Sequence, residues 1–170
     1  MLFTSIVKDG NEVIFKMNSY CENPIEALKL QKVEGMRIKP HLHTSAELIY
    51  IENGEAALTT GTLEYKLQKG DFVFVMPSML HCITPTVEDT TVYVINIKVE
   101  LISDIIKRYS GLRPASPVLK ATYVPSQLLY ALSALSCERD KNIAYAWINL
   151  MVNIVTSKLR FAEIHDGVTS

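Results

Sequence analysis

The chain has 170 residues, of which 48% are hydrophobic and 21% charged, and its formal net charge is −1. This length suits one domain, or one domain with an appendage, and the composition is too apolar for a disordered chain. Because Lys and Arg are spread along the sequence without a basic block, we do not expect this polypeptide alone to hold a nucleic-acid backbone.

The amino-terminal stretch and the cysteines indicate in which cellular compartment the protein works. The opening MLFTSIVKDGNEVIF lacks a basic region followed by an apolar stretch and a cleavage site, and no segment reaches the ~18 apolar residues of a membrane span. Cys21, Cys82 and Cys137 are odd in number, far apart and without a Cys-x-x-Cys pair. The sequence therefore predicts a cytoplasmic protein with no membrane partner.

Residues 1–100 have the pattern of strands joined by turns. Asn53-Gly54 between two short apolar runs is a strong hairpin signal. Alternation of apolar and polar residues follows, and then the uninterrupted apolar run FVFVM suits a buried strand. Several short strands with turn residues between them predict a β-sandwich or barrel. The predicted strands lie within residues 26–34, 46–60, 61–77 and 90–99.

Residues 101–170 have a helical pattern and form the second predicted region, a helical appendage that ends in a polar, linker-like tail. Helices are predicted over residues 101–109, 126–138 and 142–162, the last with a wide apolar stripe. The stripe can pack on the strand half, form a subunit interface, or do both. The residues expected at a dimer interface are Trp147, Leu150, Met151 and Ile154.

Four ligand-type side chains are expected to converge. His41 and His43 are one residue apart, and Glu47 follows four residues after His43. If one strand ran on from His41, all three would face one side, because strand side chains alternate. His81 follows the predicted buried strand and would meet them across the sheet.

Three imidazoles and one carboxylate form a mixed nitrogen and oxygen donor set. Such a set suits a divalent metal such as Zn, Ni, Fe or Mn and leaves coordination positions open for a further ligand. The same four side chains could instead hydrogen-bond a polar effector, so the sequence leaves metal binding open. A His-x-His pair by itself is explained as simply by two partly buried histidines bonded to their neighbours.

The spacing of these residues resembles the first motif of the cupin superfamily. From Gly35 the chain reads GMRIKPHLHTSAELIYIENG, with the Gly, His, His, Glu and Gly of that motif at its spacing. The resemblance covers roughly residues 26–99. It implies a small antiparallel β-barrel of the double-stranded β-helix type, with His41, His43, Glu47 and His81 as the metal ligands.

The second motif departs from the cupin pattern. Gly70 and His81 keep the separation of that motif, but Pro77 is one place late, Ser78 replaces a Gly, and Pro85 stands where an Asn is expected. In this form GDFVFVMPSMLHCI is similar to the sensor domains of AraC-type transcription regulators.

This resemblance implies a cupin-like barrel that binds a small-molecule effector, with sugars among the candidates, and helices that pair two subunits as a homodimer. DNA would be bound only by a helix-turn-helix domain that is missing from this chain, because nothing after residue 125 offers two such units. Arg37, Tyr65 and Phe72 are candidates for lining the effector pocket. The alternative function is a stand-alone metal-dependent cupin enzyme of the dioxygenase or sugar isomerase type, in which the metal acts as a Lewis acid or oxygen-binding centre.

Overall fold

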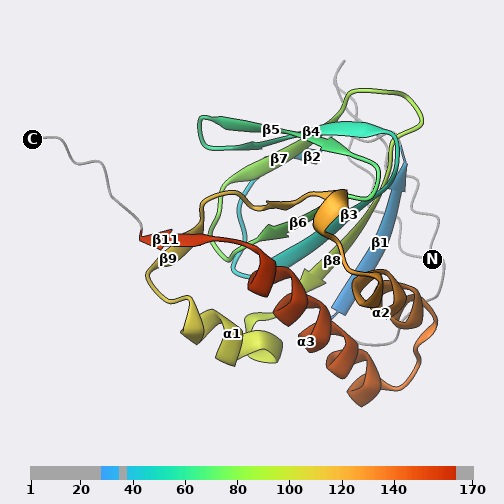
Figure 1. Ribbon diagram of the computed structural model, residues 1–170, viewed down its shortest axis with the longest axis vertical. Coiled ribbons are helices and arrows are strands. Elements are labelled where there is room, and N and C mark those ends of the chain that lie inside the picture. Colours follow the sequence, from blue (N-terminus) through green and yellow to red (C-terminus); the bar gives the residue numbers. More distant parts are fainter. Residues whose placement is uncertain (1–27, 35–37, 164–170) are drawn as a thin grey trace, which may run out of the picture.

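The structure is a computed structural model that describes residues 28–34 and 38–163. Its described part has three layers, namely a four-stranded sheet, a five-stranded sheet and a set of helices (Figure 1). Arg37 and the predicted linker-like tail lie outside the described residues.

The five-stranded sheet is the middle layer, and each pair of neighbouring strands in it is antiparallel. Its apolar side chains alternate between the two faces, so one face looks toward the other sheet and one toward the helices. In spatial order it contains β1 (Leu28–Glu34), β8 (Thr91–Ile97), β3 (Ala46–Asn53), β6 (Phe72–Val75) and β10 (Val118–Leu119).

The four-stranded sheet faces it and completes the barrel. It contains, in spatial order, β2 (Ile38–His41), β7 (His81–Pro85), β4 (Glu55–Thr60) and β5 (Leu63–Gln68). Between the two sheets lies the barrel core, a cluster of buried apolar residues. Its buried members are Ile49, Ile51, Ala56, Leu58, Leu67, Val73, Val75, Ile83, Val92, Val94 and Val118. This arrangement is the cupin double-stranded β-helix, as predicted.

Helices cover the outer face of the five-stranded sheet and bury a second cluster there, the helix-facing core. α3 contributes Ile148, Met151, Val152 and Val155 to it. The elements after the barrel are η1 (Val99–Ile102), α1 (Ser103–Arg108), β9 (Leu112–Pro114), η2 (Ala121–Tyr123), α2 (Ser126–Cys137), α3 (Lys141–Lys158) and β11 (Phe161–Glu163).

β6 shows why its sequence is an unbroken apolar run. Phe72 and Phe74 belong to the helix-facing core, whereas Val73 and Val75 belong to the barrel core. All four side chains are fully buried, because this strand has a packed layer on each face.

The structure corrects two predicted boundaries. The last helix does not run to residue 162: α3 ends at Lys158, Leu159 is extended, and the chain then pairs as β11 with β9. β10 lies in the part predicted to be helical and pairs with β6, so the barrel takes one strand from beyond residue 100. Both short strands, β10 and β11, are too brief to show a period in the sequence.

Candidate metal centre

The predicted ligand residues come from three strands and one loop. In the β2–β7 pair, His41 lies directly opposite His81. β2 ends at His41, and the chain bends through residues 42–45 before β3 begins at Ala46. The condition that one strand runs on from His41 to Glu47 is therefore not met. The three side chains meet because the chain crosses from one sheet to the other between them.

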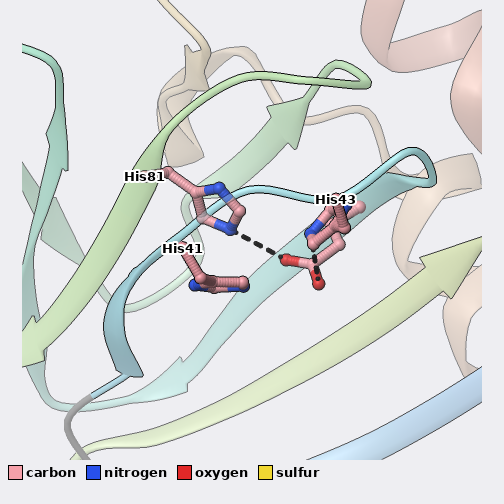
Figure 2. Close-up of side chains that lie close together, drawn as sticks. His41, His43 and His81 are labelled. Carbon is pink, nitrogen blue, oxygen red and sulfur yellow. Dashed lines mark hydrogen bonds and ion pairs between the residues drawn. The ribbon is translucent and has the colours of Figure 1, made fainter.

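The four side chains nevertheless converge as expected, and we refer to them as the His/Glu cluster. One donor atom from each of His41, His43, Glu47 and His81 lies within 4.8 Å of the others. The centroids of the His41 and His81 rings are 4.3 Å apart, and each is 5.3 Å from the His43 ring. Figure 2 shows the three imidazoles around one space between the strands.

All three imidazoles are oriented in the same way by the backbone. Nδ1 of His41 donates to the Lys39 carbonyl, and Nδ1 of His81 donates to the Met79 carbonyl, each at 2.9 Å. Nδ1 of His43 donates to the Ser45 carbonyl, also at 2.9 Å. A proton fixed on Nδ1 leaves Nε2 as the atom that can offer a lone pair to a metal.

Glu47 is the buried charge of the cluster, at 6% exposure. Its Oε2 accepts from His81 Nε2 at 3.2 Å, and its Oε1 accepts from Asn96 Nδ2 at 3.3 Å. Burial raises the pKa of Glu47, but the His81 hydrogen bond and the charges of His43, His81 and His41 outweigh it and lower the pKa below its usual value. Burial lowers the pKa of His81, whereas the bonds to Glu47 and to the Met79 carbonyl raise it, with a net increase.

His43 gives the test of whether a metal fits. Its Nε2 lies 3.0 Å from Glu47 Oε1, yet this buried nitrogen has no hydrogen-bond partner among the described residues. A buried polar atom without a partner is costly unless something else occupies its lone pair. Donor atoms bound to one metal at about 2.0–2.2 Å are at most about 4.4 Å apart, so the four side chains, whose donor atoms lie within 4.8 Å of one another, would move inward to bind an ion.

Ser78 holds the loop that carries His43. Its backbone N–H donates to the His43 carbonyl at 2.8 Å. Ser78 has a φ of 60°, the left-handed conformation that glycine adopts most easily. The cupin motif has a glycine at this position, so the replacement seen in the sequence keeps the turn and places a strained residue beside the site.

The other predicted pocket residues are not part of the cluster. Tyr65 is partly buried and packs against the barrel core. Phe72 is fully buried in the helix-facing core, so it cannot line the barrel interior. Parity along β6 decides this, because Phe72 and the barrel-facing Val73 point to opposite faces.

Asn96 is a site residue that the sequence analysis missed. It lies on β8 directly opposite Glu47 of β3 and contacts its carboxylate. The available signal was a polar residue inside the apolar run TVYVINIKV, at the parity of Val92 and Val94, which face the barrel core.

A surface pocket of about 490 Å³ lies beside the loop of the cluster. This volume falls in the range of small-molecule sites. The pocket is bounded by the loop between β2 and β3 on one side and by η1 on the other. Its lining residues are Thr44, Ser45, Lys98, Val99, Glu100 and Leu101.

Barrel, helices and His/Glu cluster together define a cupin domain with a group of side chains that could hold a divalent metal. The model of the AraC-like ligand binding domain family matches residues 23–151, well over half of the sequence. The chain belongs to this family. No helix in the described part of the chain is long and apolar enough to cross a membrane.

Solved structures similar to this chain include cupins with different activities. An oxalate decarboxylase from Bacillus subtilis is 19% identical over 49% of this chain and 25% of its own, with a TM-score of 0.41. The DMSP lyase from Ruegeria pomeroyi is 24% identical over 42% of this chain and 39% of its own, with a TM-score of 0.38. A cupin-like protein from Thermotoga maritima is 21% identical over 50% of this chain and 67% of its own, with a TM-score of 0.41.

The aligned region spans only a quarter of the oxalate decarboxylase chain. No curated protein matches the sequence significantly.

Proposed function

We propose that this chain is the effector-sensing and dimerisation domain of an AraC-type transcription regulator that works in the cytoplasm. The observation that supports it most is the family match over residues 23–151, which covers the described strands of the barrel, α1, α2 and more than half of α3. DNA would be bound by a helix-turn-helix domain attached to this one in a longer protein.

A divalent metal held by His41, His43, Glu47 and His81 is part of the proposal. The orphaned Nε2 of His43 and the shared orientation of the three imidazoles support it. Zn, Ni, Fe or Mn suits three imidazoles and one carboxylate, and such a metal would supply an open coordination position for a polar effector. Metal and effector would then bind beside the apolar barrel core, next to the loop between β2 and β3.

The pocket beside the cluster offers a route from effector to helices. One wall is the loop after His43, and the other is η1, which leads directly into α1. An effector seated there would touch the metal-binding loop and the start of the helical layer at once. It would shift the arrangement of the helices only in so far as it binds one arrangement more tightly than the other.

The test uses the natural gene product. Its intact mass from the source cell is expected to exceed the 19.1 kDa of this chain. Binding of the full-length protein to its promoter DNA is then measured in a panel of small polar molecules, sugars included, with and without Zn²⁺. A full-length regulator whose DNA binding no metal or effector changes would contradict the sensing role.

A stand-alone metal-dependent cupin enzyme is the second candidate. The complete set of four ligand-type side chains favours it, since such a metal can act as a Lewis acid. A natural product with the mass of this chain, together with dioxygenase or isomerase turnover that the His41→Ala variant abolishes, would favour the enzyme over the sensor.

A further inference from the structure

We infer that Asn96 is a positioning residue for the proposed metal centre: it holds the Glu47 carboxylate in the orientation that presents one oxygen to the ion. This inference rests on the metal binding proposed above. Asn96 comes from β8, a strand that carries none of the four candidate ligands.

The position of Asn96 in the sheet supports this role. Val92 and Val94 point into the barrel core, and Asn96 is the next residue of the same parity. Its backbone partner in β3 is Glu47, and its Nδ2 lies 3.3 Å from Glu47 Oε1. The barrel-facing side chain of β8 is therefore an amide, and not a valine, at the position that pairs with the buried carboxylate of β3.

The hydrogen-bond donors around Glu47 explain why the amide is needed. Without a metal, His81 Nε2 donates to Oε2, and His43 Nε2 lies 3.0 Å from Oε1. Once His81 Nε2 offers its lone pair to a cation, it no longer donates a proton to the carboxylate. Of the nitrogens that contact Glu47 in the described residues, Asn96 Nδ2 then remains as the donor.

The chemistry of the amide also suits this task. Asn96 is neutral, so it can fix a carboxylate oxygen without the repulsion that a Lys or Arg would exert on a divalent cation. Partners that hold a metal ligand in place typically change metal affinity by about 10–100-fold when they are removed.

The experiment compares Zn²⁺ affinity in the intact chain and in the Asn96→Leu variant, which has similar size and no donor. Affinity is measured by competition with a chromophoric chelator, and Co²⁺ absorption reports the geometry of the ligands. We expect about 10–100-fold weaker Zn²⁺ binding and an altered Co²⁺ spectrum, in a metal-free variant that remains folded.

Two further variants make the result decisive. Asn96→Ala tests the same loss with a smaller side chain, in case leucine disturbs the fold. Tyr93→Phe is the matched control, because Tyr93 also lies on β8 but donates to Glu52, away from the cluster. It should leave the Zn²⁺ affinity and the Co²⁺ spectrum unchanged.

Two other outcomes would contradict the proposal, and they differ in how much of it fails. If the unchanged chain binds Zn²⁺ and the folded Asn96 variants bind it equally well, Asn96 is a solvated strand residue and only this inference fails. If the unchanged chain binds neither Zn²⁺ nor Co²⁺, the metal centre and the role of Asn96 both fail.

Discussion

His41 and His81 face each other across the antiparallel β2–β7 pair, with ring centroids 4.3 Å apart. Each ring donates Nδ1–H to a backbone carbonyl two residues before it in the chain. The pairing of two strands thus places two imidazoles in equivalent orientations. Glu47 and His43 then complete the cluster from the neighbouring sheet and the connecting loop.

Because the ligands are already assembled, a divalent ion should stabilise the fold. Zn²⁺ at about 100 times its dissociation constant should add about 2.7 kcal/mol to the free energy of unfolding. The melting temperature with and without Zn²⁺ measures this. His41→Ala should lose most of the rise, whereas Lys39→Ala should keep it, because only the backbone carbonyl of Lys39 contacts His41. A full Zn²⁺ response in His41→Ala would contradict the site.

The metal-free protein should show a stability that falls as the pH rises above about 6.5. The pKa of His81 is raised in the folded state, so its contribution is complete below its unfolded value of 6.5 and is lost as pH rises through the folded value. The pKa of Glu47 is lowered, so its contribution is present above 4.5 and is lost as pH falls through the folded value.

Urea unfolding of chelator-treated protein from pH 4 to 8 checks this, and Glu47→Gln should flatten the fall above about pH 6.5. Zn²⁺ affinity should change in the opposite direction and weaken in acid, because the imidazoles must be deprotonated to bind it. A metal-free stability that is constant from pH 6 to 8 would show that the pair does not form.

The four residues of the cluster could be predicted from sequence because the spacing around them resembles the cupin motifs, in which residues at these positions bind a metal. His81 was found although the three strands β4, β5 and β6 lie between β3 and its own strand, because its separation from Gly70 is that of the second cupin motif. Asn96 could not be found in this way. A single polar residue in a strand has the same appearance whether it is solvated or faces a carboxylate, and only the β3–β8 register distinguishes the two.

The fold class could also be predicted from the sequence, but the point after His41 where the chain crosses from one sheet to the other could not. Asn53-Gly54 marked the β3–β4 hairpin, and the apolar run marked β6. The break after His41 leaves no such signal, because residues 42–45 contain neither Gly nor Pro.

Ser78→Gly should stabilise the protein. Ser78 has a φ of 60°, a conformation that costs a residue with a Cβ about 1 kcal/mol and costs glycine almost nothing. Chemical denaturation should therefore show a gain of up to about 1 kcal/mol. Ser110→Gly is the control, since Ser110 is an exposed turn residue outside the left-handed region and should lose stability instead. A loss in both variants would exclude strain at Ser78.

α3 is where we expect two subunits to pair. Ile143 and Leu150 are 49% and 42% exposed, seven residues apart on one face, and Trp147 lies partly buried between them. Ile154 packs partly against the helix-facing core, and Met151 is fully buried there, so Met151 offers no surface to a second chain.

Leu150→Arg should convert a dimer to a monomer, measured by light scattering over a range of concentrations. Glu64→Arg is the control, because this exposed residue lies on β5 in the layer farthest from the helices (Figure 1). If the protein without substitutions has the mass of a monomer at every concentration, pairing through α3 is refuted.

Asp71 should be the most sensitive acidic residue for stability outside the cluster. Its buried carboxylate accepts from the backbone N–H of Gln68 and of Ala121, and from Lys120 Nζ at 2.8 Å. It therefore ties the turn between β5 and β6 to the start of η2. Asp71→Asn keeps the size but turns an amide toward donors, and should cost roughly 1–3 kcal/mol in urea unfolding. Glu64→Gln removes an exposed charge and should change stability by less than about 0.5 kcal/mol. Equal stability of the two variants would mean that Lys120 and the backbone donors find other partners.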